Sequence, residues 1–182
     1  MKTEGDNPLG KGFVHVYTGN GKGKTTAALG LAFRAMGHKT RTYVGQFMKG
    51  QSYGELEAAK MVQPYITFEQ YGKETFIHIA SPPKDKDIRD AQIGLTKAKK
   101  AMLSGKFSIV VLDEIITANH FRLVSVKDML DFIDQKPDGV ELIFTGRYAP
   151  AVLVDAADLV TEMKEIKHYF AKGIGAREGI ER

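Results

Sequence analysis

The segment from Thr18 to Thr26 constrains the fold more strongly than any other part of this sequence. It reads TGNGKGKTT and lies between a short apolar segment, Phe13 to Tyr17, and an alanine-rich segment of helical character that runs to about Met36. Glycines in such a loop allow backbone N–H groups to converge on phosphate oxygens, and the start of the following helix adds a partial positive charge. Lys24 supplies a mobile full charge, and the hydroxyl of Thr25 is suited to magnesium. We therefore predict a strand, a phosphate-binding loop and a helix, in this order.

The loop departs from the standard phosphate-loop pattern at its first position. The pattern G-x-x-x-x-G-K-[ST] requires glycine where this chain has Thr18, whereas Gly23, Lys24 and Thr25 match it. A glycine-rich turn with an incidental lysine is the alternative interpretation, but the strand before the loop and the helix after it favour phosphate binding. The candidate nucleotide-binding residues of the loop are Thr18, Gly19, Asn20, Gly21, Lys22, Gly23, Lys24, Thr25 and Thr26.

A pair of carboxylates supports this interpretation from another part of the chain. Asp113 and Glu114 directly follow the apolar segment Ser108 to Leu112. Ligands of open α/β sheets bind at the carboxyl ends of the strands, and in phosphate-loop proteins an aspartate at this position holds magnesium, directly or through water. Such a pair on its own is more often a helix cap or a solvated turn. Together with the upstream loop it predicts a magnesium site formed by Thr25 and Asp113.

The rest of the chain alternates short apolar segments with helical patterns, which is typical of an α/β fold. Some strands, such as Ile109 to Leu112, are apolar without alternation, and this indicates burial on both faces of a mostly parallel sheet. Helices must then cover both sides, so we predict three layers. The predicted strands are Phe13–Tyr17, Thr40–Phe47, Ile66–Tyr71, Ser108–Leu112, Val140–Phe144 and Leu159–Met163.

Two further segments have apolar residues at the spacing of an amphipathic helix. One contains Ile88, Ala91, Leu95, Ala98 and Met102; the other contains Val126, Met129, Leu130 and Ile133, with Ser125 as the predicted N-cap. We interpret both sets as faces that pack against the core. Residues 72–86 and the C-terminal tail, residues 164–182, are irregular, and long loops in a compact domain are often functional.

Bulk properties limit the class of protein. A chain of 182 residues with 43% hydrophobic content suits one domain over residues 1–182, with residues 1–12 expected to be flexible. The absence of cysteine excludes disulfides, thiolate metal sites and a cysteine nucleophile. The first twelve residues lack the apolar run of a secretory signal and no later stretch reaches the length that spans a bilayer, so we expect a cytoplasmic protein without a membrane partner.

The charge balance favours an anionic small molecule. Lysine and arginine outnumber aspartate and glutamate by 26 to 22, for a formal net charge of +4, and the pI is about 9.1. A basic patch for nucleic acid is the alternative, but the lysines are scattered and the single Lys-Lys pair, Lys99-Lys100, lies on a predicted helix. We therefore expect no nucleic-acid partner.

Several separate motifs, in the same order along the chain, resemble the ATP:corrinoid adenosyltransferases related to the cobalamin-biosynthesis enzyme. The resemblance covers nearly all of the chain from Phe13 to Ile180. It rests on Thr18–Thr26, Gln46–Gly50, Val110–Glu114, Thr145–Arg147, Asp158–Glu162, Ile166–His168, Gly173–Ile174 and Gly179–Ile180.

This resemblance implies a RecA-like P-loop fold, a homodimer and a defined reaction. Family members transfer the 5′-deoxyadenosyl group of ATP to the Co(I) of a corrinoid and release triphosphate, in cobalamin biosynthesis or salvage. They hold ATP in an orientation reversed from that of ordinary P-loop enzymes, and they also depart from the standard loop at the position of Thr18. The reductant that produces Co(I) generally comes from a flavoprotein partner.

The resemblance also implies roles for individual residues. Lys24, Thr25 and Asp113 would be catalytic, with magnesium on Thr25 and Asp113. Glu114 and Asn20 would orient the nucleoside. Arg34 matches a family arginine near the ATP. Phe76, with Tyr71 and Phe68 in the same segment, would contact the corrinoid. The family's phenylalanine–tryptophan pattern is absent because this chain has no tryptophan, and His78 would take the place of the tryptophan.

Two alternatives remain open from the sequence. An ordinary P-loop ATPase or kinase would use the same loop but attack the terminal phosphorus, and Glu114 could position its nucleophile. A non-enzymatic module would bind nucleotide or nucleic acid through its basic surface without turnover. The five histidines are dispersed, and we find no activated serine or histidine nucleophile in the sequence.

Overall fold

All six predicted strands are present in the computed structural model, which describes residues 10–50, 53–72 and 83–181. The strands are β1 (Val14–Thr18), β2 (Thr42–Phe47), β3 (Ile66–Tyr71), β4 (Ile109–Asp113), β5 (Glu141–Thr145) and β6 (Leu159–Glu162). The helices are α1 (Lys24–Met36), α2 (Gly54–Met61), α3 (Asp85–Leu103), α4 (Ile115–His120), α5 (Val126–Asp134) and α6 (Ala151–Ala156), with a 3-10 helix η1 (Tyr169–Lys172).

The strands form one sheet in the order β3-β2-β4-β5-β1-β6, and every neighbouring pair is parallel. All carboxyl ends therefore lie at the same edge. The loop that follows β1 and Asp113 at the end of β4 meet at this edge, with β5 between their two strands. This order is consistent with the RecA-like P-loop fold that the resemblance implies.

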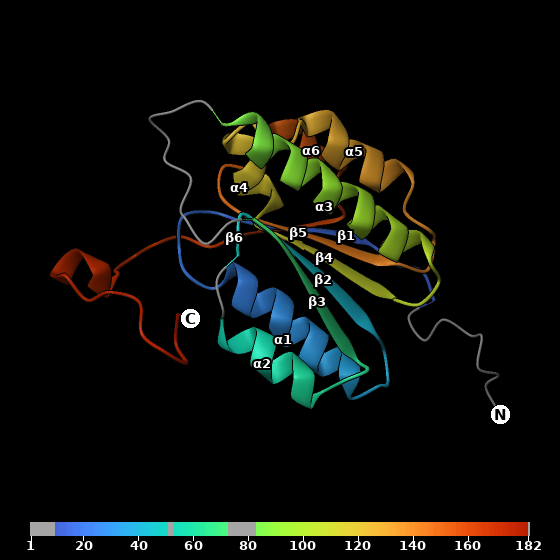
Figure 1. Cartoon of the computed structure of the whole chain (residues 1–182), viewed down its shortest axis with the longest axis horizontal. Coiled ribbons are helices and arrows are strands. Elements are labelled where there is room, and N and C mark those ends of the chain that lie inside the picture. The colour runs from blue at the N-terminus through green and yellow to red at the C-terminus, as the bar shows by residue number, and fades with distance from the viewer. Residues whose placement is uncertain (1–9, 51–52, 73–82, 182) are drawn as a thin grey trace.

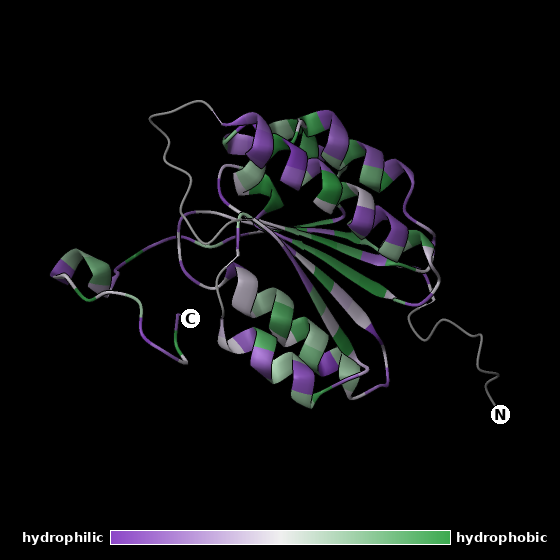
Figure 2. Cartoon of the chain, viewed as in Figure 1, coloured by the Kyte–Doolittle hydropathy of each residue, from purple (hydrophilic) through white to green (hydrophobic). Residues whose placement is uncertain are grey.

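Helices cover both faces of the sheet, as the apolar strands predict. Helices α1 and α2 lie on one face and α3 to α6 on the other (Figure 1). The core under α1 joins Ala28, Ala32 and Ala35 to apolar residues of β2, β3, β4 and β5. The central strands β4 and β5 are mainly hydrophobic, whereas the outer faces of α3 and α5 are largely hydrophilic (Figure 2). The three-layer α/β fold predicted from the sequence is thus confirmed.

The predicted helix faces pack as expected, with one difference. Ala91, Leu95, Ala98 and Met102 of α3 are buried. Ser125 caps α5 through a capping box with Asp128. On α5, Phe132 is buried beside Met129, whereas Leu130 is only half-buried, so the inward stripe is rotated slightly from the predicted one.

Strand β2 begins two residues later than predicted. The N–H of Thr40 donates a hydrogen bond to the carbonyl of Ala35, which holds Thr40 at the end of α1 instead of in the sheet. The short helices α2, α4 and α6 were not predicted, because six to eight residues are too few to display a clear helical period.

The tail that follows β6 runs outward from the sheet to η1 and then turns back (Figure 1). Within the described ranges, no helix combines the length and the apolar character needed to cross a membrane.

Candidate active site

The phosphate loop packs against the backbone that extends β6. The N–H of Met163 donates to the carbonyl of Thr18 at 2.8 Å, and the N–H of Gly21 donates to the carbonyl of Met163 at 2.7 Å. A Cβ atom added at Gly19 would lie 2.4 Å from the Met163 carbonyl oxygen, and Gly19 has φ 95°. Gly23 has φ 123° immediately before α1. Glycine is therefore required where the loop turns and where it contacts the extended chain.

Lys24, the first residue of α1, folds back into the loop. Its ammonium donates to the carbonyl oxygens of Gly19 at 2.8 Å and Gly21 at 2.7 Å, and the residue is 6% exposed. Burial, and then the neighbouring charge of Arg147, lower the pKa of Lys24, while nearby carboxylates oppose this. A cation thus lies inside the loop, bonded to the loop's own carbonyls.

Asp113 is fully buried and accepts hydrogen bonds from four side chains. Its Oδ1 accepts from the hydroxyls of Thr25 at 2.8 Å and Thr145 at 2.7 Å. Its Oδ2 accepts from the ammonium of Lys49 at 2.9 Å and the amide of Gln46 at 3.2 Å. Two oxygens of an ionised carboxylate provide about four lone-pair sites, so this carboxylate is saturated.

Thr25, backed by Asp113, fits a magnesium site that phosphate ligands complete, because the Thr25 hydroxyl donates its proton to Asp113 and keeps its lone pairs for a cation. Among the described residues, no group of three or more His, Cys, Asp or Glu side chains could hold a metal without further ligands. Most of the ligands would then come from phosphate oxygens and water.

Lys49 lies two residues beyond β2 and faces Asp113 from the side opposite Thr25. Its ammonium is 3.7 Å from a carboxylate oxygen of Glu55 and 5.2 Å from the ring centre of Tyr53. Burial alone would lower the pKa of Lys49, but the charge and hydrogen bond of Asp113 outweigh burial, so the pKa is raised. Lys49 is therefore a fixed positive charge.

The residues that follow β4 are hydrogen-bonded to those at the end of β5. Glu114 adopts left-handed backbone angles, with φ 60°, and its N–H donates to the hydroxyl of Thr145 at 2.9 Å. The Glu114 carboxylate accepts a hydrogen bond from the hydroxyl of Thr117, and this same hydroxyl accepts from the N–H of Arg147 at 2.9 Å. Gly146, with φ 144°, lies so close to Thr117 that an added Cβ would be 2.6 Å from its backbone nitrogen. These contacts between the two segments fix both Glu114 and Arg147 at the pocket.

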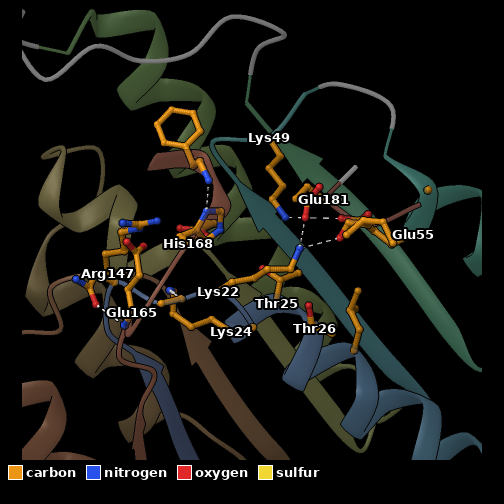
Figure 3. A pocket seen from close by; sticks show the side chains of 18 of the residues that line it. Lys22, Lys24, Thr25, Thr26, Lys49, Glu55, Arg147, Glu165, His168 and Glu181 are labelled. Atoms are coloured by element: carbon orange, nitrogen blue, oxygen red, sulfur yellow. Dashed lines mark hydrogen bonds and ion pairs between the residues drawn. The ribbon is translucent and has the colours of Figure 1, made fainter. Parts of the chain in front are cut away.

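These side chains surround a pocket of about 950 Å³, at the upper end of the range for small-molecule sites. Arg147 and Glu165 lie on one side of it, and Lys49 and Glu55 on the other (Figure 3). The lining residues are Asn20, Gly21, Lys22, Gly23, Lys24, Thr25, Thr26, Leu29, Lys49, Gly54, Glu55, Glu114, Arg147, Glu165, His168, Phe170, Gly179, Ile180 and Glu181.

The C-terminal tail forms part of this pocket. The ammonium of Lys22 donates to the carbonyl of Ile180 at 3.0 Å and to the carboxylate of Glu181 at 2.8 Å. Glu181 also accepts hydrogen bonds from the Tyr169 hydroxyl and from Arg177. The hydrogen bond from Lys22 lowers the pKa of Glu181. The tail is therefore anchored to the phosphate loop through one of the loop's own cations.

The structure brings most of the predicted site residues together. From Asn20 to Thr26 the loop lines the pocket with Glu114, and Asp113 lies behind Thr25. The side-chain oxygen of Asn20 accepts from the N–H of Glu165 at 3.1 Å. Thr18 and Gly19 belong to the loop but do not line the pocket.

Two of the other residues predicted for the site, Arg34 and Tyr71, lie away from this pocket. Arg34 is exposed in the last turn of α1, roughly 15 Å along the helix from Lys24, and it does not line the pocket; its contact with ATP stays a prediction. Phe76 and His78 lie outside the described residues. Tyr71 is 7% exposed and packs on Phe47 in the core.

Sequence reasoning did not assign to the site several residues that the structure places there. Lys49 and Arg147 each lie two residues beyond a strand, after β2 and β5 respectively. Since the carboxyl ends of parallel strands share one edge, polar residues just after each buried strand were the signal that could have identified them. The polar residues that were missed include Gln46, Lys49, Glu55, Thr145, Arg147, Glu165 and Glu181.

Comparison with known proteins identifies the family. Residues 10–182 match the family model described as ATP:corrinoid adenosyltransferase BtuR/CobO/CobP. The chain belongs to this family. The resemblance drawn from the sequence motifs is therefore confirmed.

Individual corrinoid adenosyltransferases match nearly the whole chain. A corrinoid adenosyltransferase of Sinorhizobium sp is 36% identical over 178 residues, covering 94% of this chain and 80% of the relative. One of Pseudomonas aeruginosa is 32% identical, covering 94% and 84%, and one of Escherichia coli strain K12 is 30% identical, covering 94% and 86%.

Proposed function

We propose that this chain transfers the 5′-deoxyadenosyl group of ATP to the Co(I) of a corrinoid, in cobalamin biosynthesis or salvage. Membership in the corrinoid adenosyltransferase family carries this proposal. The pocket supports it, because four cationic side chains converge where a triphosphate would bind: Lys22, Lys24, Lys49 and Arg147.

In this reaction the protein has to assist the leaving group more than the nucleophile. The electron pair of Co(I) attacks the 5′ carbon of the ribose, a cobalt–carbon bond forms, and the bond from that carbon to the triphosphate oxygen breaks. The bonding pair leaves with triphosphate, and cobalt becomes formally Co(III). Because reduced cobalt is itself the nucleophile, the protein need not activate a serine, cysteine or histidine. Its task is to stabilise charge on the departing oxygen.

The phosphate loop supplies this stabilisation in our proposal. We expect backbone N–H groups between Gly19 and Thr25 to donate to the bound anion, apart from that of Gly21, which donates to the carbonyl of Met163, and Lys24 provides a full charge. In the structure this ammonium bonds to the carbonyls of Gly19 and Gly21. We expect it to exchange these carbonyls for phosphate oxygens when ATP binds. Arg147 faces the same pocket and adds a second cation.

Magnesium would be held by Thr25, with Asp113 directly behind it. When bound, magnesium neutralises charge on phosphate oxygens. The carboxylate of Asp113 accepts a hydrogen bond from the Thr25 hydroxyl and thereby fixes the orientation of this hydroxyl.

The nucleoside and corrinoid contacts remain proposals based on the family. Glu114 and Asn20 line the pocket and would orient the nucleoside. Arg34 would contact ATP, and Phe76 would contact the corrin ring. We also propose that residues 1–182 form a single domain and that the protein acts as a cytoplasmic homodimer. A flavoprotein would supply the electrons that produce Co(I).

One assay tests the proposed function against its alternatives. Protein, magnesium-ATP and chemically reduced cobalamin are mixed without oxygen, and the products are identified. A light-sensitive adenosylated corrinoid is the expected result. ADP and phosphate would instead support a P-loop ATPase or kinase, and unchanged ATP would support a binding module without turnover.

A further inference from the structure

The hydrogen bonds that Asp113 accepts occupy both of its carboxylate oxygens and leave no lone pair for a metal ion. Four side chains donate to this carboxylate, and one of them, Lys49, carries a full positive charge 2.9 Å from Oδ2. We propose that Lys49 is a positioning residue that prevents Asp113 from binding a divalent cation directly, so that Asp113 orients the Thr25 hydroxyl instead. The proposal rests on the proposed function only in that the cation accompanies ATP.

The hydrogen bond between Thr25 and Asp113 sets the direction of the Thr25 hydroxyl. A hydroxyl has one proton and two lone pairs. Because its proton points to Oδ1 of Asp113, its lone pairs point away from the carboxylate. Thr145 occupies the remaining acceptor site of Oδ1, at 2.7 Å. The oxygen left to bind a cation is therefore that of Thr25.

The other side of the carboxylate is equally fixed. Gln46, fully buried, donates to Oδ2 of Asp113 at 3.2 Å and to Glu55 at 3.1 Å, while its own oxygen accepts from Gln70 at 3.1 Å. Lys49 lies between the two carboxylates of Asp113 and Glu55. Displacing either donor would leave buried polar groups without partners, which is costly. Oδ2 of Asp113 is thus part of a buried hydrogen-bond network and is not available to bind a cation.

The charge of Lys49 has a consequence for cation binding without nucleotide. An ammonium in contact with the carboxylate repels a divalent cation that approaches the same group. The protein should therefore bind the cation weakly until phosphate oxygens supply additional negative ligands. In this arrangement the cation enters and leaves with the polyphosphate.

Manganese binding to the nucleotide-free protein tests this proposal. Free Mn²⁺ is measured by electron paramagnetic resonance as the ion is titrated into each variant. In Lys49→Gln, the uncovered Asp113 should bind Mn²⁺ on the order of tenfold more tightly than the unmodified protein. Lys49→Arg retains the charge and should bind as weakly as the unmodified protein. Lys60→Gln removes an exposed ammonium on α2 and controls for net charge.

The double variant Lys49→Gln with Asp113→Asn should lose the added affinity. Unchanged Mn²⁺ binding in folded Lys49→Gln, or tight binding that persists in the double variant, would overturn the proposal. If Lys49→Gln does not fold, the unmodified protein decides: without ATP it should leave added Mn²⁺ in solution, and a tightly bound ion would contradict the proposal. None of these readouts depends on corrinoid turnover, so they remain valid if the proposed function fails.

Discussion

Lys22 of the phosphate loop donates a hydrogen bond to the carboxylate of Glu181, 159 positions later in the chain, at 2.8 Å. The carboxylate of Glu181 thus contacts the ammonium of Lys22, a cation that lines the nucleotide pocket. Glu181 thus occupies a position at which a phosphate oxygen of ATP could bind Lys22. The tail and the nucleotide would compete for the same ammonium.

We therefore expect Glu181→Gln to strengthen ATP binding. Loss of the carboxylate leaves Lys22 free for phosphate, and exposed ion pairs are weak, so the gain in affinity should be about two- to fivefold. Isothermal titration with ATP measures it. Glu57→Gln, which breaks an exposed ion pair on α2, is the matched control and should leave ATP affinity unchanged. Weaker ATP binding in Glu181→Gln would show that the carboxylate assists the nucleotide.

Gly19→Ala should destabilise the fold. The new Cβ would lie 2.4 Å from the Met163 carbonyl oxygen, at a φ that alanine rarely adopts, so we expect a loss of about 1–3 kcal/mol in the free energy of unfolding. Gly30 lies inside α1 with open space around its Cβ position. Gly30→Ala should therefore stabilise the protein by about 0.5–1 kcal/mol. Chemical denaturation measures both, and equal effects would contradict this account of the loop.

The fold was predictable because its strands carry a strong signal. Continuous apolar segments such as Ile109 to Leu112 form strands that are buried on both faces. Parallel strands share one carboxyl edge, and in phosphate-loop proteins an aspartate at this edge lies beside the hydroxyl of the loop, so the contact of Thr25 with Asp113 was predictable. The predicted start of β2 was wrong because the N–H of Thr40 is bonded to the end of α1, and this contact depends on how α1 ends.

The rest of the site depends on contacts between distant segments. The pairing of Lys22 with Glu181 follows from the path of the tail, for which no periodic pattern exists in the sequence. The contact of Lys49 with Asp113 requires β2 and β4 to be neighbours, and strand order is not visible in a single strand. Short helices such as α4 are stabilised by tertiary packing and not by a long apolar stripe.

Removing the hydroxyl of Thr25 should weaken the response to magnesium. In Thr25→Val the proposed magnesium ligand is lost while the shape of the side chain is retained, so turnover at a fixed magnesium concentration should fall about 10- to 100-fold. Thr25→Ser keeps the hydroxyl and should stay close to the unmodified enzyme. Adenosylation rates measured over a range of magnesium concentrations distinguish the two, and identical curves for Val and Ser would exclude a role for the hydroxyl.

Lys24→Ala should reduce turnover on the order of 100- to 1,000-fold, because it removes the cation placed to meet charge on the leaving triphosphate. Anaerobic single-turnover rates measure this loss. Lys60→Ala on α2 provides the control with the same change in net charge. Full activity in folded Lys24→Ala would contradict the assignment.

The most direct test of the central claim follows the 5′ carbon of ATP. ATP labelled with ¹³C at this carbon is incubated without oxygen with the protein, magnesium and reduced cobalamin, and ¹³C and ³¹P NMR spectra are recorded. The account predicts that the label becomes bonded to cobalt and that triphosphate appears in equal amount. Labelled ADP with free phosphate would contradict it, since that result places the attack at the terminal phosphorus.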